Sequence, residues 1–100
     1  MNYCIVWRFV VAEAQQAEFE AAYGPDGPWA ELFRKAEGFI GVELMRSTEK
    51  AGTYLTVDRW SSQAAFESFR ERFAVEYHAL DVRLEGVSKT EARIGAFDSL

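Results

Sequence analysis

The sequence is poor in the residues that hold metals or build disulfide frameworks. It contains one cysteine, Cys4, and one histidine, His78, in 100 residues. A single cysteine cannot form an intrachain disulfide, and no Cys/His cluster with metal-ligand spacing is present. We therefore expect no metal, and a protein suited to the reducing cytoplasm.

Basic residues and long apolar runs are also scarce. The 11 Lys and Arg are outnumbered by 16 Asp and Glu, which gives a formal net charge of -5. Nucleic-acid-binding proteins gather Lys and Arg on one face, so we expect no nucleic-acid partner. The apolar stretch YCIVWRFVVA, residues 3–12, has no positively charged leader, is interrupted by Arg8 and is too short to span a bilayer. We expect neither a signal peptide nor a membrane contact.

What is present fits one small globular domain, residues 1–100, because 49% of the residues are hydrophobic and 27% are charged. Dense β-branched and aromatic residues predict strands at 3–11, 39–47, 53–60 and 87–97. Helical spacing of apolar residues predicts helices at 13–23 and 29–36, separated by GPDGP, and a third from Ser61 or Ser62 that ends at Gly86. Gly38 is expected in a left-handed conformation after the helix at 29–36.

The predicted order is strand, helix, strand, strand, helix, strand. This is the split βαβ, or ferredoxin-like, α+β arrangement, in which KAG at residues 50–52 joins two antiparallel neighbours of a four-stranded antiparallel sheet.

The first strand predicts a homodimer. Its odd positions carry Tyr3, Ile5, Trp7, Phe9 and Val11, and its even positions carry Cys4, Val6, Arg8 and Val10, so both faces are mostly apolar. Helices can cover only one face of a four-stranded sheet, and a second subunit is the simplest cover for the other. We expect two copies packed sheet against sheet.

The sequence resembles the dimeric α+β barrel proteins, and within them the antibiotic biosynthesis monooxygenase family. The resemblance covers almost the whole chain and rests on the apolar first strand, GFIGVELMRS, a strand ending in DRW, and SSQAAFESF opening the following helix. It implies oxidation of aromatic, polyketide-like substrates by O2 without metal or organic cofactor. A related branch of the family degrades heme.

The residues that act in these two branches are matched only in part. The quinone-forming members carry Asn four positions before a Trp and Tyr six after it; here the Trp is Trp60, and the other positions hold Thr56 and Phe66. The heme-degrading branch uses Asn on the first strand, Trp on the second helix and a later His. The resemblance places Trp7, Phe69 and His78 at or next to these positions.

Two candidate catalytic residues follow. Trp60, where a strand turns into a helix, could stack on a flat substrate or simply anchor the corner. His78 is the only histidine, the residue type whose unperturbed pKa lies near neutral pH, and it could act as general base or could be an exposed residue. The candidate substrate-binding residues are aromatic, and the alternative for each is a place in the core: Trp7, Tyr23, Trp29, Phe33, Phe66, Phe69, Phe73 and Tyr77. Charged strand residues, Asp58 among them, are expected in ion pairs at the sheet rim or dimer interface.

These observations predict a cofactor-independent monooxygenase acting on a flat aromatic small molecule. The alternative is a non-catalytic dimeric barrel that binds a small apolar ligand in a stress or regulatory role. A cavity of roughly 300 Å3 or more containing a polar group would favour the enzyme over the alternative.

Overall fold

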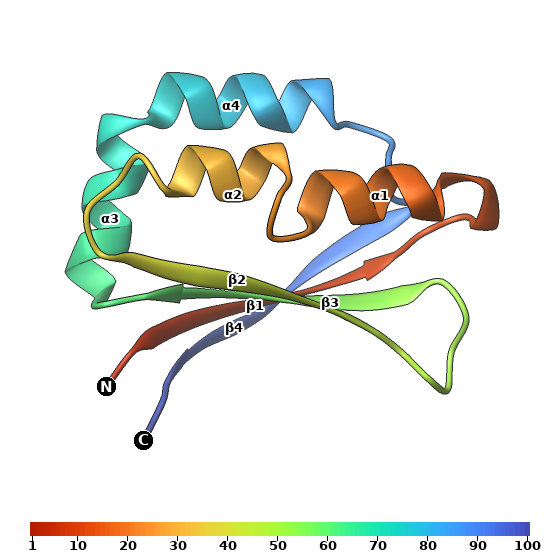
Figure 1. The fold of residues 1–100 in the computed structure, drawn as a ribbon, viewed down its shortest axis with the longest axis horizontal. Coiled ribbons are helices and arrows are strands. Elements are labelled where there is room, and N and C mark those ends of the chain that lie inside the picture. Colours follow the sequence, from red (N-terminus) through yellow and green to blue (C-terminus); the bar gives the residue numbers. More distant parts are fainter.

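The computed structural model describes residues 1–100 and contains one four-stranded antiparallel sheet. The strand order is β2-β3-β1-β4 (Figure 1). The strands are β1 (Tyr3–Val10), β2 (Phe39–Arg46), β3 (Thr53–Trp60) and β4 (Thr90–Asp98). β1 and β3 are the central pair, in the register Val6 to Val57. The predicted ferredoxin-like α+β fold is confirmed.

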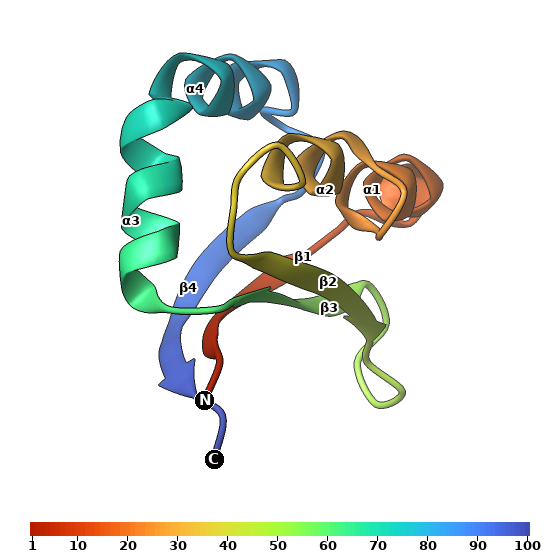
Figure 2. The ribbon, with the colours of Figure 1, turned by 60° about the vertical axis from the view of Figure 1, so that its left-hand side comes forward.

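The helices lie over one face of the sheet (Figures 1 and 2). They are a 3-10 turn (Glu13–Gln15), α1 (Gln16–Tyr23), α2 (Pro28–Phe33), α3 (Gln63–Arg72) and α4 (Ala74–Arg83). Pro28 stands in the first turn of α2, where its missing N–H removes no helical hydrogen bond. The predicted cap of α3 is Ser62, whose Oγ accepts a hydrogen bond from the Ala65 N–H at 3.1 Å. None of these helices is long and apolar enough to cross a membrane.

The helical region after Ser62 differs from the sequence prediction, which made it a single helix. The chain turns at Phe73, with φ -111° and ψ 27°, so that α3 stands beside the sheet and α4 runs above α2 (Figure 2). A straight helix of about 20 residues would be about 30 Å long, and its C-terminal half would extend beyond the sheet. The turn lets Phe69 on α3 and Leu80 on α4 enter the same core cluster.

Gly38 fixes the entry to β2. Its φ is +86°, as predicted, and an added Cβ would lie 2.6 Å from Ala65 Cβ and 2.7 Å from Ser61 Oγ. Its carbonyl accepts a hydrogen bond from the Ser61 N–H at 2.7 Å. The start of β2 and the start of α3 are therefore held together, and only glycine fits between them.

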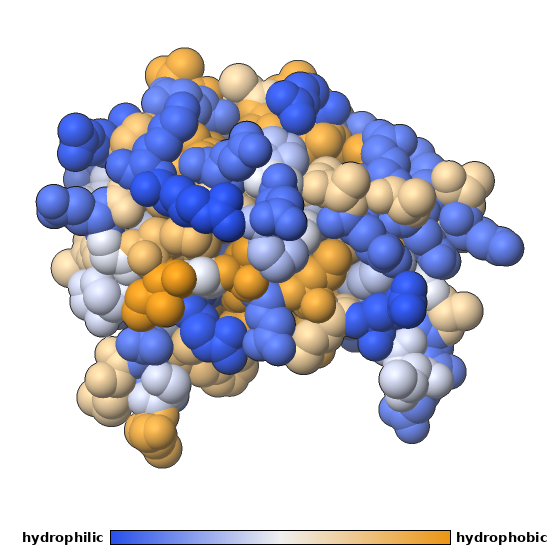
Figure 3. Space-filling view, in the orientation of Figure 1, coloured by the Kyte–Doolittle hydropathy of each residue, from blue (hydrophilic) through white to orange (hydrophobic).

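The helix-covered core forms two aromatic clusters. One surrounds Trp60 and Phe69 beneath α2, α3 and α4. The other surrounds Phe19 and Tyr54 beneath α1. Figure 3 shows hydrophobic side chains gathered between the helical layer and the strands, with hydrophilic ones over the outer surface of the helices.

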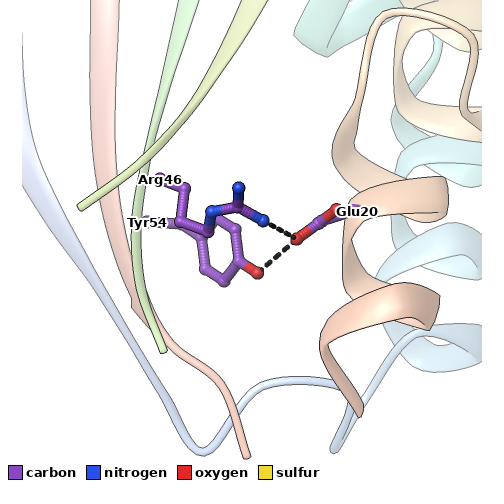
Figure 4. A network of polar contacts seen from close by, with 3 residues as sticks. All are labelled: Glu20, Arg46 and Tyr54. Atoms are coloured by element: carbon purple, nitrogen blue, oxygen red, sulfur yellow. Dashed lines mark hydrogen bonds and ion pairs between the residues drawn. The ribbon is translucent and has the colours of Figure 1, made fainter. Parts of the chain in front are cut away.

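A polar contact ties α1 to the sheet (Figure 4). Glu20 Oε2 on α1 accepts a hydrogen bond from the Tyr54 hydroxyl at 2.5 Å and lies 3.4 Å from Arg46 Nη1. Burial raises the pKa of Tyr54, and the hydrogen bond to Glu20 raises it further. Tyr54 thus keeps its proton and holds α1 in place over β3.

No helix covers the other face of the sheet (Figure 2). The strand register places Val6 beside Val57, and Leu55 beside Met45, on this face. Met45 is 39% exposed and Phe97, opposite Cys4, is 51% exposed, so the apolar surface is open.

Candidate functional site

The candidate site is a cavity of about 90 Å3 between the sheet and helices α1, α2 and α4. It lies between the two aromatic clusters, since Phe9 of one cluster and Phe33 of the other both line it together with Tyr23, which packs against both. All four strands contribute to its wall. The lining residues are Trp7, Phe9, Tyr23, Trp29, Phe33, Val42, Thr56, Asp58, Tyr77, Asp81 and Glu91.

Aromatic rings form most of the wall. Trp29 packs edge-on against Tyr77, with ring centroids 5.0 Å apart, and is 6.3 Å from Tyr23. The indole N–H of Trp29 is buried and has no hydrogen-bond partner. Such rings offer flat apolar surface to a ligand.

Asp58 is the unusual residue of the wall. It lies on β3 between Ile5 and Val42 in the strand register, on the face covered by the helices. Its carboxylate makes no ion pair or hydrogen bond, since the two ion pairs of the structure are Arg46–Glu20 and Arg59–Glu43. Burial raises the pKa of Asp58 from 3.8 to about 7. A carboxyl group in this state can exchange a proton with a ligand near neutral pH.

Two further carboxylates, Asp81 on α4 and Glu91 on β4, line the cavity where it opens to solvent, and both are exposed. Partial burial raises the pKa of Glu91, and the nearby charge of Asp81 raises it further. No Lys or Arg lines the cavity, and the three carboxylates do not form a group that could hold a metal ion. The site is therefore apolar in its walls and negative in its charge.

The two tyrosines of the wall keep their protons. Burial raises the pKa of Tyr23 to about 12, with smaller contributions from Glu91 and Asp81. The Trp29 indole N–H is close enough to oppose this shift, although it does not reach hydrogen-bonding geometry. Burial also raises the pKa of Tyr77, against the opposing charge of Arg70. Both hydroxyls can donate hydrogen bonds but cannot serve as bases near neutral pH.

The structure brings together five of the eight aromatic residues predicted to bind substrate. Trp7, Tyr23, Trp29, Phe33 and Tyr77 line the cavity. Phe66, Phe69 and Phe73 do not: they lie on α3 and at its C-terminal end and pack around Trp60 or Phe69. These three residues were predicted to bind substrate because they continue the apolar face of one helix with Tyr77. The turn at Phe73 separates them from Tyr77 and directs them into the core instead.

Trp60 and His78 do not line the cavity. Trp60 is 0% exposed and packs between Phe33, at 5.6 Å, and Phe69, at 5.0 Å. His78 is exposed on α4, in a shallow groove that shares Asp81 with the opening of the cavity. Neither side chain can touch a ligand in the cavity without rearrangement, so their catalytic roles stay predictions.

The size of the cavity and the place of Asp58 bear on two other expectations. The cavity, at about 90 Å3, falls short of the roughly 300 Å3 that would favour the enzyme over the non-catalytic barrel, although it does contain a polar group. Asp58 was expected in an ion pair at the sheet rim or dimer interface and instead lines the cavity unpaired. The sequence already indicated this position. Asp58 is two residues from both Thr56 and Trp60, and alternate residues of a strand lie on the same face.

The comparison with known proteins agrees with this architecture. Residues 2–78 match the family model "Antibiotic biosynthesis monooxygenase". No protein of curated function matches the sequence.

Solved structures extend the comparison to the whole chain. A mutant of SnoaB, a cofactor-independent oxygenase from Streptomyces nogalater, is 28% identical with a TM-score of 0.75, over 98% of this chain and 92% of that one. A second SnoaB structure is 26% identical, with a TM-score of 0.72, over 99% and 93% of the two chains. A mutant of MhuD with two manganese protoporphyrin IX molecules bound per active site shares the fold at 21% identity, with a TM-score of 0.74 over 98% and 94%. The chain belongs to the antibiotic biosynthesis monooxygenase family.

Proposed function

We propose that this protein is a cofactor-independent monooxygenase that acts on a flat aromatic small molecule. The observation that carries the proposal is Asp58, an unpaired carboxyl group whose pKa is raised to about 7 by burial in a cavity with aromatic walls. Membership of the family and the likeness to SnoaB, a cofactor-independent oxygenase, support it.

The proposed first step is removal of a proton from the substrate. The Asp58 carboxylate accepts the proton of an acidic C–H or O–H group, and the substrate becomes an electron-rich anion. Trp7, Trp29 and Tyr77 lie on the wall where they can stack on that anion and exclude water from it.

The anion then reacts with O2. Addition of O2 to the deprotonated carbon and return of a proton give a hydroperoxide, which loses water to leave a carbonyl. For a CH2 group the balance is one O2 consumed, one C=O formed and one H2O released. Protonated Asp58 can return the proton that it removed, so that the carboxylate is restored.

Entry of a substrate requires the wall to open. A cavity of about 90 Å3 is too small for a polycyclic molecule. Trp7 and Tyr77 are only partly buried, and their movement would enlarge the cavity toward solvent. Trp60 would act indirectly in this proposal, by supporting the ring of Phe33 at 5.6 Å.

Oxygen uptake with anthrone tests the proposal. Wild-type protein should consume one O2 per anthraquinone formed, and Asp58→Asn should lose most of the turnover because an amide cannot accept the proton. Asp98→Asn is the matched control, since Asp98 lies exposed on β4 outside the cavity. Equal turnover by both variants, or by wild type and Asp58→Asn, would contradict the role of Asp58.

The small cavity also favours a second candidate, a non-catalytic barrel that binds a small apolar ligand. Anthrone, hydroquinones and heme can be screened for binding by quenching of tryptophan fluorescence. Binding without oxygen uptake would favour this second function over the first.

We also propose that the protein is a homodimer that packs through the open face of its sheet, and that it acts in the cytoplasm. The exposed apolar side chains of Met45 and Phe97 on a face without helices support the first statement. The lone, buried thiol of Cys4 is in keeping with the second. Sedimentation equilibrium should give twice the chain mass of 11.4 kDa.

A further inference from the structure

We propose that the cavity selects aromatic ligands that carry a protonated amine, with the ring among the aromatic walls and the ammonium group between Asp81 and Glu91 at the opening. The inference rests on the proposed function, because it names the class of substrate for the same cavity.

The charge of the lining is the first argument. Every ionisable group that lines the cavity is an acid: three carboxyl groups, Asp58, Asp81 and Glu91, and two tyrosines. An anionic aromatic would meet like charges and no compensating Lys or Arg, which disfavours binding. A cationic ligand is attracted both by the carboxylates and by the faces of the surrounding aromatic rings.

The unpartnered carboxyl group in the wall of the cavity is the second, independent argument. Asp58 is largely buried and makes no ion pair or hydrogen bond. Buried polar groups are normally satisfied, so a cavity wall that leaves this carboxyl group free suits a polar ligand. A hydroxyl on the ring, donating to Asp58, would supply the missing partner.

The positions of the three acids give the ligand an orientation. Asp58 comes from the central strand β3, whereas Asp81 and Glu91 are exposed at the opening. Asp81 and Glu91 both line the cavity and the neighbouring groove, and the nearby charge of Asp81 raises the pKa of Glu91. A ring with a hydroxyl at one end and a short aminoalkyl chain at the other matches this arrangement.

The neighbouring groove does not neutralise the two acids. It contains Lys89 and His78, but neither forms an ion pair with Asp81 or Glu91. The acids at the opening are therefore free to pair with a ligand.

Three probes of similar shape and different charge test the inference: tyramine, 4-ethylphenol and 3-(4-hydroxyphenyl)propionate, titrated at pH 7.5 with tryptophan fluorescence as the readout. Tyramine should bind about tenfold more tightly than 4-ethylphenol, since one cation–π contact and one partly exposed ion pair together supply that factor. The propionate should bind most weakly. Equal affinities for tyramine and 4-ethylphenol, or no binding of any probe, would overturn the inference.

Variants separate a site from general attraction to an acidic protein. Glu91→Gln and Asp81→Asn should each reduce the preference for tyramine about threefold or more and leave 4-ethylphenol binding unchanged. Glu71→Gln, on the exposed surface of α3, changes the net charge equally and should leave the preference intact. An equal effect of Glu71→Gln would overturn the site.

The outcomes also separate this inference from the proposed function. Anthrone oxidation without any preference for tyramine would leave the monooxygenase standing and overturn the inference. Preference for tyramine without oxygen uptake on any aromatic would support the inference on the ligand and contradict the monooxygenase.

Discussion

Replacement of Asp58 by Asn should stabilise the protein, and the gain should depend on pH. The pKa of Asp58 rises from 3.8 to about 7 because burial disfavours the charged carboxylate. Below the unfolded-state value both states hold the proton, so the carboxyl group has no effect there. As pH rises from about 4 to about 7 the unfolded chain releases the proton more readily than the folded one, and the folded state loses stability.

The size of the effect follows from the shift. At about 1.4 kcal/mol per unit, a change from 3.8 to about 7 corresponds to roughly 4 kcal/mol above pH 7. Asp58 is only mostly buried, and water at the opening of the cavity reduces this value, so about 2 to 3 kcal/mol is expected. Between pH 5 and pH 8 the advantage of Asp58→Asn over wild type should grow by about 2 kcal/mol.

Urea unfolding from pH 5 to pH 8, at one protein concentration, measures this growth directly. Comparison across pH removes any constant effect of the amide, because asparagine does not titrate. Asp98→Asn, on an exposed position of β4, should follow wild type throughout. A constant difference between Asp58→Asn and wild type at all pH values would refute the argument that Asp58 is buried without a partner.

The remaining predictions concern scaffold and assembly. Trp60→Phe should lower the free energy of unfolding by about 1 to 3 kcal/mol through a core cavity, and unchanged urea stability would contradict this. Tyr54→Phe should cost about 1 to 2 kcal/mol in the same assay, because Glu20 loses the hydroxyl that donates to it at 2.5 Å. Val6→Lys should dissociate or unfold the dimer in sedimentation experiments, and an intact dimer would argue against the sheet interface. His78→Gln should leave turnover and its pH profile unchanged, and a large loss of turnover in a folded variant would indicate that His78 is the base.

The order of elements could be predicted from the sequence because it depends on local signals. Period-two and helical patterns marked the strands and helices, GPDGP separated α1 from α2, and Gly38 has the expected positive φ. The turn at Phe73 could not be predicted in this way, since no glycine or proline marks it. It is set by tertiary packing, which draws Leu80 and Phe69 into one cluster.

The site was predicted less well than the fold, for a related reason. The sequence shows that aromatic residues face the core but not which of them pack fully. Trp60 is surrounded on all sides by rings from α2, β2 and α3, whereas Trp7 meets a space that no side chain fills. That difference depends on the relative positions of two helices and a sheet. The spacing of residues along one strand does not determine these positions.

Asp58 is difficult to explain by structure alone. The carboxylate lies between Ile5 and Val42, makes no ion pair and lowers stability when it is charged. A threonine or valine at the same place on β3 would suit the strand and the apolar wall without this penalty. Thr56, two residues earlier on the same face, lines the cavity without an ionisable group. A charged residue that weakens the fold at a cavity with aromatic walls is therefore best explained by what it does to a ligand there. Proton removal is the chemistry that a carboxylate of raised pKa performs.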